Sequence, residues 1–464
     1  MLNAVVDLVK NVEVAAIIGP ETSPQAQFVI NVGERAQVPI ISFSATSPFL
    51  SPLQNPYFVR ATQDDSSQVQ ALSALVQAFG WRQVVPIYVN NEFGDGIVPS
   101  LVEALQQIGT RILYRSVIPS IATDDQIAAE LYRLKSLQTR VFIVHMTGPL
   151  AQRLFMKAQQ LGMISQDYVW IITNSVANVL NLLDHQVIQS MHGILGVKTY
   201  VPKTRELERF IIRWKIKFIQ QNPGILIPQM NVYGLWAYDA TTALGKAVEQ
   251  VGITNVSFHQ ARISTNLSTD LSTFRVSQVG PSLLRVILHT KFRGLSGNFV
   301  LVDGQLQSSI FQLVNVMGNR EQEIGFWTLQ NGLIRKLTST NTKYSTTKAN
   351  LDAIVWPGNS TSVPKGWVVS LNGKKLQIGV PVKDGFSEFV KVIQDPTTNR
   401  IEVQGFCIDV FNAVIAKLPY SVPIEYVPFA KSNDEPASTY DELIYQVYEQ
   451  VIMVFNVFYT CTLI

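Results

Sequence analysis

Short apolar runs alternate with amphipathic segments through much of the chain. The runs at 38–43, 84–89 and 141–146 have the composition of buried strands, and the segments between them repeat apolar residues at helical spacing. Strands that alternate with helices predict parallel sheets covered by helices on both faces. The pattern therefore predicts an α/β protein with doubly wound parallel sheets.

The same pattern places the individual elements. The N-cap of the third helix is predicted at Asp65 or Ser66. Helices are predicted at 2–9, 25–35, 69–79, 95–107, 124–137, 149–161, 204–221 and 232–251. Strands are predicted at 14–18, 38–43, 84–89, 111–117, 141–146, 168–173, 298–303, 311–316 and 376–380.

Two of the early strands end in small hydroxyl residues, at 15–23 and 38–48. Ligands of open α/β sheets bind beyond the carboxyl ends of the strands, and free N–H groups at a helix start suit a carboxylate. The alternative is that the hydroxyls only cap helices. The two segments together predict a site for a small anion or zwitterion, such as an amino acid.

Composition narrows the class of protein. A chain of 464 residues, 47% apolar and 15% charged, predicts two or three packed lobes. The net charge of +3 gives no reason to expect a nucleic-acid partner. The 2 cysteines and 5 histidines follow no metal-ligand spacing, and we find no dinucleotide, P-loop or nucleophile-elbow motif. No cofactor, no metal and no enzymatic activity are therefore expected.

Three sequons, at Asn255, Asn266 and Asn359, lie in polar stretches and favour an extracellular setting. The opening residues do not have the pattern of a signal peptide. The uncharged run at 451–464 is too short to cross a bilayer.

A domain boundary is predicted in the last third of the chain. Residues 338–348 are polar, and Asn372-Gly373 is a turn signal before the next strand. Residues 376–449 carry 5 Lys and Arg against 11 Asp and Glu, whereas the rest of the chain is basic.

Several longer segments resemble a known family. "RATQDDSSQ" (60–68), "FGWRQVVPIYVNNEFG" (79–94) and "FRGLSGNFVLVDG" (292–304) resemble the bilobal, periplasmic-binding-type outer domain of glutamate receptors. "LQIGVPVKDGFSEFV" (376–390) and "GFCIDVFNAVIAKLPYSVPIEYVPF" (405–429) look like the first segment of their agonist-binding domain. The wording of "VPIISFSATSP" and "GFCIDVF" is similar to the plant glutamate receptor-like channels.

The resemblance implies a type I periplasmic-binding-like domain followed by a partial type II agonist domain. Lobe 1 of the outer domain would take about 1–80 and 230–290, and lobe 2 about 81–229 and 291–337. The rest would divide into a linker at 338–375, an incomplete agonist segment at 376–449 and a hydrophobic tail outside the family at 450–464, with a terminal strand as the alternative for the tail.

In function, the resemblance implies the extracellular amino-acid-sensing part of a ligand-gated cation channel of the plasma membrane, usually calcium-permeable. The ligand would be glutamate, glycine or a similar amino acid, and the partners would be other subunits of a tetramer. Binding would close two lobes on the ligand without covalent chemistry. Membrane contact would come only through pore helices, which this sequence does not contain.

Site residues follow from the same resemblance. Ser44 and Thr46 would offer hydroxyls, and backbone N–H groups near Ala45 would meet the α-carboxylate. The outer cleft would be formed by Ser23, Ser44, Ala45, Thr46, Asp64 and Tyr88, with Asp64 near the ammonium and Tyr88 or Phe93 closing from lobe 2. Core packing is the alternative for Tyr88, and Trp81 and Trp236 are expected to pack.

Tyr426 and Phe429 would form a wall of the agonist domain, with core packing again the alternative.

The chain departs from the family at both ends. The family's first strands precede the helix at 2–9, so the strand at 14–18 is expected to lie at a sheet edge. No Arg or Lys follows Lys431, so the agonist-clamping arginine is missing. We therefore interpret the sequence as a fragment. The alternatives are a soluble amino-acid-binding protein, a regulatory fragment that pairs with full-length subunits, a heptahelical amino-acid receptor and an α/β enzyme.

Overall fold

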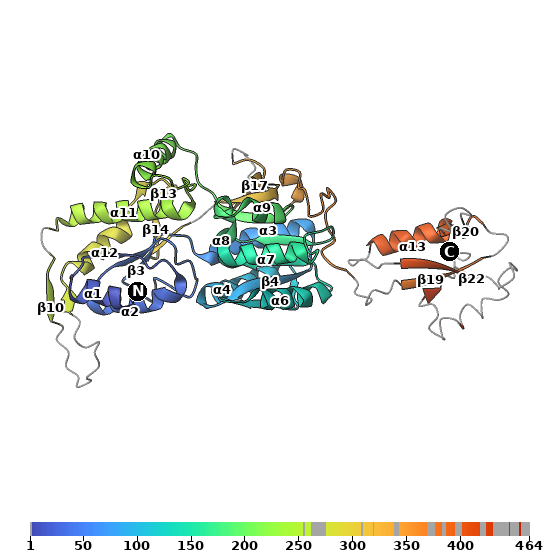
Figure 1. Cartoon of the computed structure of the whole chain (residues 1–464), viewed down its shortest axis with the longest axis horizontal. Helices are drawn as coiled ribbons and strands as arrows, with labels where there is room; N and C mark the ends of the chain where they lie inside the picture. The colour runs from blue at the N-terminus through green and yellow to red at the C-terminus, as the bar shows by residue number, and fades with distance from the viewer. Residues whose placement is uncertain are drawn as a thin grey trace, which may run out of the picture. The chain divides into compact units, whose positions relative to one another are not determined.

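The computed structural model of the chain divides into two compact units, each of which is described by itself. Unit 1 comprises 1–134 and 141–364, and unit 2 comprises 135–140 and 365–464. The residues outside the description form the grey trace of Figure 1. The structure describes residues 2–253, 256–260, 275–307, 310–318, 320–337, 343–368, 376–382, 387–394, 401–417, 424–429, 445 and 454–455.

Lobe 1 of unit 1 is a small sheet with helices on both faces (Figure 1). Its strands follow the order β1 (Ile17–Ile18), β2 (Ile40–Ser42), β3 (Phe58–Arg60), β15 (Gln305–Leu306) and β14 (Leu301–Val302), and only the β14–β15 pair is antiparallel. As predicted, β1 lies at the edge of this sheet.

Alternate residues of these strands enter two separate cores. Ile40 and Phe58 pack against α1 (Leu2–Lys10) and α2 (Ser23–Ala36). The neighbouring Ile41 and Val59 pack against the other side of the sheet, because successive side chains of a strand point to opposite faces. The helices on that side are α11 (Val232–Val251) and α12 (Gly280–His289).

Lobe 2 contains a larger mixed sheet, in the order β18-β17-β16-β9-β8-β7-β4-β5 with β6 also pairing with β4. The strands from β9 to β4 are parallel to one another, and β16, β17 and β18 join antiparallel. The bounds are β4 (Gln83–Asn90), β5 (Arg111–Ile112), β6 (Ser116–Pro119), β7 (Val141–His145), β8 (Val169–Ile172), β9 (Leu195–Thr199), β16 (Ile310–Met317), β17 (Arg320–Thr328) and β18 (Gly332–Ile334).

Lobe 2 also contains several helices, and the remaining elements of unit 1 are short. The helices are η1 (Asp65–Gln68), α3 (Val69–Phe79), α4 (Glu92–Gly96), α5 (Val98–Gln107), α6 (Asp124–Ser136), α7 (Gly148–Gln160), α8 (Asn174–Ala177), η2 (Leu180–Leu182) and α9 (His185–Ser190). The short pieces are β10 (Phe258–Gln260), β11 (Arg275–Ser277), β12 (Phe292–Arg293), β13 (Asn298–Phe299) and η4 (Lys348–Asn350).

Two predicted elements are each divided in the structure. The helix predicted at 95–107 is α4 followed by α5, because Pro99 lacks an N–H group and fits the first turn of a new helix. The strand predicted at 111–117 is β5 and β6, which pair with different parts of β4.

The lobe boundaries differ from those predicted. Helix α3 packs in the core of lobe 2 with Trp81 and Val84, although it was assigned to lobe 1. Residues 292–306 pack in the core of lobe 1 through Phe299 and Leu301. Each of these segments joins the lobe against which its apolar face is buried, and that choice depends on residues remote in sequence.

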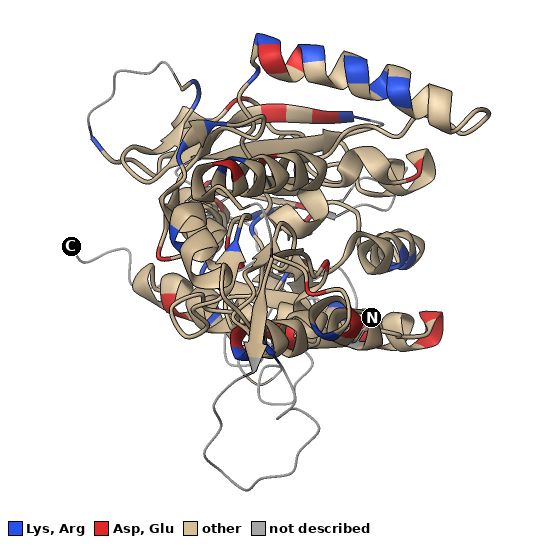
Figure 2. Cartoon of the chain, turned by 90° about the vertical axis from the view of Figure 1, so that its left-hand side faces the viewer, with Lys and Arg blue, Asp and Glu red and all other residues tan. Residues whose placement is uncertain are grey.

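Helix α10 (Arg205–Gln221) also joins lobe 1, where Leu207 packs with Leu235 and Leu295. It was predicted in lobe 2. Several Lys and Arg residues lie along this helix, which is at the top of Figure 2. Ile212, Ile216 and Ile219 are exposed on it.

Much of the segment predicted as a linker packs onto lobe 2 instead. Leu351 and Trp356 are buried in its core. The Trp356 ring lies edge-on to Phe79 at 5.2 Å and to Trp81 at 5.8 Å. The indole N–H of Trp81 donates to the carbonyl of Pro364 at 3.0 Å. The boundary between the units therefore follows Pro364 rather than residue 337.

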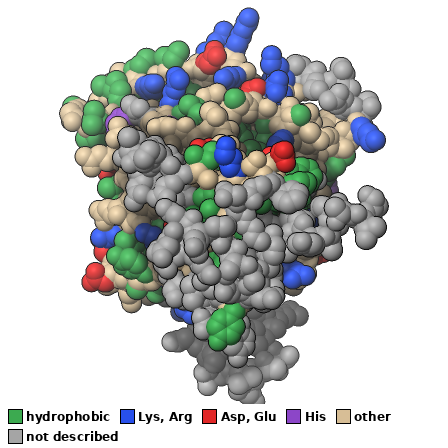
Figure 3. All heavy atoms as spheres, turned by 90° about the vertical axis from the view of Figure 1, so that its right-hand side faces the viewer, with side chains coloured by type: hydrophobic (Ala, Val, Ile, Leu, Met, Phe, Trp, Pro, Cys, Tyr) green, Lys and Arg blue, Asp and Glu red, His purple; other side chains and the backbone are tan. Residues whose placement is uncertain are grey.

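In unit 2, β19 (Leu376–Pro381) pairs in parallel with β22 (Ile424–Phe429) and with β23 (Val454–Phe455). An antiparallel pair, β20 (Lys391–Gln394) and β21 (Ile401–Gln404), precedes α13 (Phe406–Lys417). Many residues of this unit lie outside the description and are grey in Figure 3. The pairing of β23 agrees with the alternative considered for the tail, a terminal strand.

Candidate functional site

A cleft of about 610 Å³ lies between the two lobes of unit 1. Its walls follow the carboxyl ends of strands in both lobes, as expected for ligand sites of α/β sheets. Lobe 1 contributes the segments after β1 and β2 and the start of α11, and lobe 2 the segments after β4, β7 and β8. The lining residues are Glu21, Thr22, Ser23, Pro24, Phe43, Ser44, Thr46, Asn91, Phe93, Thr147, Gly148, Pro149, Gln152, Ser175, Val179, Leu182, Leu183, Asn231 and Tyr233.

Three predicted site residues line this cleft, namely Ser23, Ser44 and Thr46. Phe93, the alternative to Tyr88 as the closing aromatic residue, lines it too. Tyr88 is instead buried in the core of lobe 2, so the prediction for it is wrong and its packing alternative is confirmed. Burial raises the pKa of the Tyr88 phenol.

The backbone N–H of Ala45 itself is not available for the predicted carboxylate contact, and a contact through the neighbouring N–H groups stays a prediction. The backbone N–H of Ala45 donates to Oγ of Ser42 at 3.0 Å, and its methyl group is buried in the core of lobe 1. An N–H that is already paired inside the loop is not free to meet a ligand.

The hydroxyls that line the cleft also take part in local bonds. Oγ of Ser44 donates to the carbonyl of Glu21 at 2.7 Å, which ties the two strand-end loops together. Oγ of Ser23 accepts from the N–H of Ser47 at 3.2 Å. The hydroxyls thus fix the shape of the lobe 1 wall, and Ser44 can still accept a hydrogen bond from the cleft.

Two helices begin at the cleft from opposite lobes. Thr22 is the N-cap of α2, and Thr147 is the N-cap of α7. Neither side chain caps its helix, and each helix has a proline in its first turn. The first N–H groups of a helix carry partial positive charge, so these two starts favour an anionic group between the lobes.

Asp64 is not among the residues that line the cleft, and its contacts favour a structural role over that of an ammonium partner. Its carboxylate pairs with the guanidinium of Arg60 at 2.5 Å, and it accepts the N–H of Ser66 at 2.6 Å. Asp64 is therefore the N-cap of η1, a role predicted for Asp65 or Ser66. The Arg60 side chain is fully buried and also donates to the carbonyls of Ser47 and Leu50.

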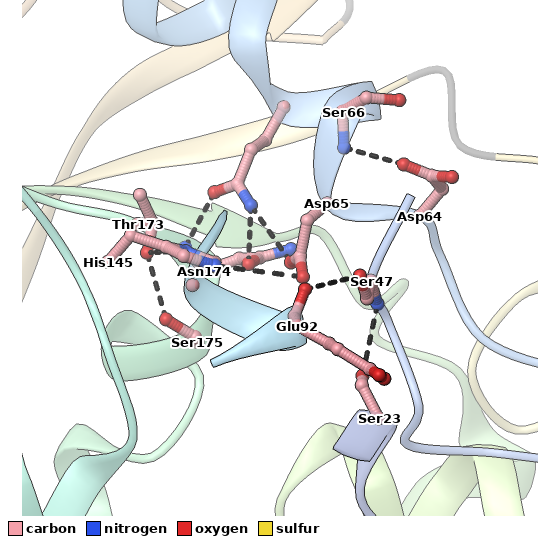
Figure 4. Close-up of polar contacts among 12 residues, drawn as sticks. Ser23, Ser47, Asp64, Asp65, Ser66, Glu92, His145, Thr173, Asn174 and Ser175 are labelled. Carbon is pink, nitrogen blue, oxygen red and sulfur yellow. Dashed lines mark hydrogen bonds and ion pairs between the residues drawn. The ribbon is translucent and has the colours of Figure 1, made fainter. Parts of the chain in front are cut away.

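The neighbouring Asp65 enters a buried polar network between the lobes (Figure 4). The backbone N–H of Asp65 donates to the carbonyl of Thr46 in the cleft wall at 3.0 Å, and His145 Nε2 lies 3.8 Å from Oδ2 of Asp65. Burial raises the pKa of Asp65 well above its usual range and lowers the pKa of His145 to about 4. Phe93 covers the His145 ring at 4.4 Å between centroids.

This network contains further hydrogen bonds, and one of them connects lobe 1 with lobe 2. Gln68 donates through Nε2 to Oδ1 of Asn174 at 2.6 Å and accepts the Asn174 N–H at 2.7 Å. Oγ of Ser47 donates to the carbonyl of Glu92 at 2.7 Å, which links lobe 1 directly to lobe 2 (Figure 4). The sequence analysis did not predict a role for Gln68, Asn174 or Ser47. The adjacent acids Asp64 and Asp65, just before a predicted helix with an apolar face, were a signal that one carboxyl group is buried.

In unit 2, Tyr426 packs against α13 rather than standing free. Its hydroxyl donates to Oδ1 of Asn412 at 2.8 Å, and its ring faces Phe411 at 6.4 Å. These contacts favour the packing alternative for Tyr426. Phe429 ends β22 beside Pro381, and its role as a site wall stays a prediction.

The sequons are only partly described. Asn255 and Asn266 lie outside the described residues. Asn359 is exposed, and its Oδ1 lies 2.7 Å from Nε2 of His192. Whether any of them carries a glycan stays a prediction.

The described residues contain neither a metal-binding cluster nor a membrane-spanning helix. No cluster of three or more His, Cys, Asp or Glu that could hold a metal ion occurs among them. In the same part of the chain, no helix combines the length and apolar character that crossing a bilayer requires.

Two solved structures of binding proteins have a similar fold. A leucine-binding protein from Thermotoga maritima matches 71% of this chain and 84% of its own, with a TM-score of 0.56 and 17% identity. A transporter solute-binding protein from R. palustris, solved with benzoate, matches 72% and 83%, with a TM-score of 0.56 and 14% identity. The two-lobed fold and interlobe cleft thus define unit 1 as a type I periplasmic-binding-like domain.

The family follows from the sequence. The model of the "Receptor family ligand binding region" matches residues 1–319, and the chain belongs to this family. Over 448 residues, or 96% of its length, it is 50% identical to glutamate receptor 2.2 of Arabidopsis thaliana and 49% identical to glutamate receptor 2.3. It spans about half the length of these curated relatives, 48% and 49% respectively.

Proposed function

We propose that the interlobe cleft of unit 1 binds a free amino acid, and that closure of the lobes reports this binding to a ligand-gated cation channel. The cleft has a volume of about 610 Å³, within the usual range of small-molecule sites. Its position between two lobes joined by short segments suits binding by hinge closure.

The observation that carries the proposal is the convergence of two uncapped helix starts, α2 and α7, on one cleft. They would hold the α-carboxylate between them. Ser44 and Asn91 lie on the same cleft walls and can hydrogen-bond a zwitterion. The described lining residues contain no arrangement of nucleophile and base, so binding is favoured over catalysis.

The wider role is proposed from the plant glutamate receptors to which the chain is similar. It comprises an extracellular position at the plasma membrane, calcium-permeable conduction and assembly with other subunits as a tetramer, all as properties of a longer protein. Unit 2 favours this role over that of a soluble binding protein, because a transport protein does not need a second module.

The experiment is isothermal titration of the full chain with the common amino acids. We expect saturable binding of at least one of them. Thr22→Trp should abolish binding, because Thr22 lines the cleft and makes no side-chain cap that the change would remove. Thr241→Trp is the matched control, since Thr241 is exposed on α11 and is not among the lining residues.

Two outcomes would contradict the proposal. One is the absence of binding by every amino acid to a chain that melts cooperatively. The other is equal binding by the wild-type chain and Thr22→Trp, which would place the ligand outside the interlobe cleft.

A further inference from the structure

We infer that the interlobe cleft selects neutral amino acids with apolar side chains over the dicarboxylic amino acids. This inference rests on the proposed function and adds the class of ligand. It comes from the charges and the apolar surfaces of the described residues that line the cleft.

Charge is the first argument. Among the described residues that line the cleft, Glu21 is the one charged side chain, and it is acidic. The two helix starts can serve one α-carboxylate. A second carboxylate on the ligand would find no Lys, Arg or His on these walls, and an unpaired carboxylate in a closed cleft is strongly unfavourable.

The basic residues nearest along the chain serve another surface. Arg153 and Lys157 follow Gln152 on α7, but both pair with Asp124, at 2.6 Å and 3.7 Å. They line an adjoining surface hollow with Asp184, which shares Pro149 and Gln152 with the cleft, and neither Arg153 nor Lys157 is among the residues that line the cleft itself. In the present geometry they do not offer a cation to the interlobe cleft.

Apolar surface is the second argument. After α8, the chain of lobe 2 turns Val179, Leu182 and Leu183 toward the cleft. Phe43 of lobe 1 and Phe93 of lobe 2 add aromatic surface. Leu182 is 46% exposed, a large apolar area that an aliphatic ligand side chain could cover.

The carboxylate of Glu21 is placed to pair with the ammonium group of the ligand. Its backbone carbonyl is fixed by Ser44, at 2.7 Å, while its carboxylate is exposed at the cleft. An ammonium group of the ligand is the complementary charge. The same carboxylate would repel a second carboxylate on the ligand, which adds to the selection against glutamate and aspartate.

The test compares leucine, methionine, glutamine and glutamate by titration of the full chain. Glutamine and glutamate have the same shape and differ in charge, so their ratio isolates the charge argument. We expect leucine or methionine to bind at least about tenfold more tightly than glutamate, and glutamine to bind more tightly than glutamate; tenfold corresponds to about 1.4 kcal/mol.

Leu182→Arg supplies the missing cation at an exposed position, and Leu182→Met is its matched control. The arginine should raise glutamate affinity relative to leucine by about tenfold or more, whereas the methionine should leave the ratio unchanged. An unchanged ratio in Leu182→Arg would overturn the assignment of the apolar wall to the ligand side chain.

The two proposals fail in different ways. Glutamate binding as tight as that of glutamine and leucine would overturn the selectivity and keep the amino-acid site. Absence of binding by all four ligands and by the remaining amino acids would overturn the proposed function, and the selectivity with it.

Discussion

Replacing Asp65 with Asn should make the stability of unit 1 fall as the pH falls from 6.5 to 4. Burial lowers the pKa of His145 from 6.5 to about 4, so in this range the unfolded chain binds a proton on His145 that the folded protein does not bind. Stability then decreases with falling pH.

In the wild-type protein Asp65 opposes this loss. Burial raises the pKa of its carboxyl well above the usual range, so the folded protein keeps a proton on Asp65 that the unfolded chain has released. That group alone would make stability rise as the pH falls. The two buried residues lie 3.8 Å apart, and their pKa shifts act on stability in opposite directions as the pH falls.

The magnitude follows from His145 alone. A pKa that falls from 6.5 to about 4 corresponds to a loss of about 3 kcal/mol across that range, at about 1.4 kcal/mol per unit. Asp65 is not among the causes of the His145 shift, so Asp65→Asn should leave the shift in place. The stability of Asp65→Asn relative to the double variant Asp65→Asn/His145→Gln should therefore fall by about 3 kcal/mol between pH 6.5 and 4, because His145 is the group that differs between these two proteins.

The assay is urea unfolding of the full chain at several pH values, followed by tryptophan fluorescence, because Trp170, Trp236 and Trp356 lie in the cores of unit 1. Taking the difference between Asp65→Asn and the double variant Asp65→Asn/His145→Gln cancels the groups that titrate equally in both proteins and leaves His145. Asp65→Asn combined with His145→Gln should lose the pH dependence. A difference between Asp65→Asn and the double variant that stays constant between pH 6.5 and 4 would refute the lowered pKa of His145, and a constant difference between wild type and Asp65→Asn would refute the raised pKa of Asp65.

Two further predictions test how the fold is held together. Trp356→Ala should destabilise unit 1 by about 3 to 5 kcal/mol in urea unfolding, because Trp356 lies in the core. Trp214→Ala, at a half-buried position of α10, should cost clearly less. Equal losses would contradict the packing of Trp356 in the core of lobe 2. Gly280→Ala would place a methyl group 1.7 Å from the carbonyl oxygen of Gln37 and should destabilise by about 2 kcal/mol. Gly245→Ala meets open space inside α11 and should raise the melting temperature, by a stabilisation of about 1 kcal/mol, so a shift of the same sign in both variants would contradict this packing.

The sequence predicted which loops form the candidate site, but not which atoms of those loops are free to contact a ligand. Ser23, Ser44 and Thr46 were expected at the cleft and line it. Which N–H groups stay free was not visible, because the N–H of Ala45 pairs with a hydroxyl three residues earlier. A backbone N–H in a loop can pair with a nearby side chain or stay free, and which of the two occurs depends on the folded conformation of the loop.

The adjacent acids Asp64 and Asp65 illustrate the same limit. Neighbouring side chains at the start of η1 point in different directions, one to Arg60 and the surface, the other into the buried network with His145. The sequence alone does not distinguish the roles of Asp64 and Asp65, because both are aspartates at the start of the same helix. Only the long-range packing of the two lobes makes one a helix cap and the other a buried carboxyl group with a raised pKa.

By itself, the sequence determined the parallel α/β architecture and the strand-end location of the cleft. These features depend on the spacing of apolar residues within single elements, which is a local property. Tertiary structure decided which lobe receives α3, α10 and Trp356, and which polar groups face the cleft. Those choices depend on contacts between residues far apart in the chain, because an amphipathic face specifies burial without specifying its partner.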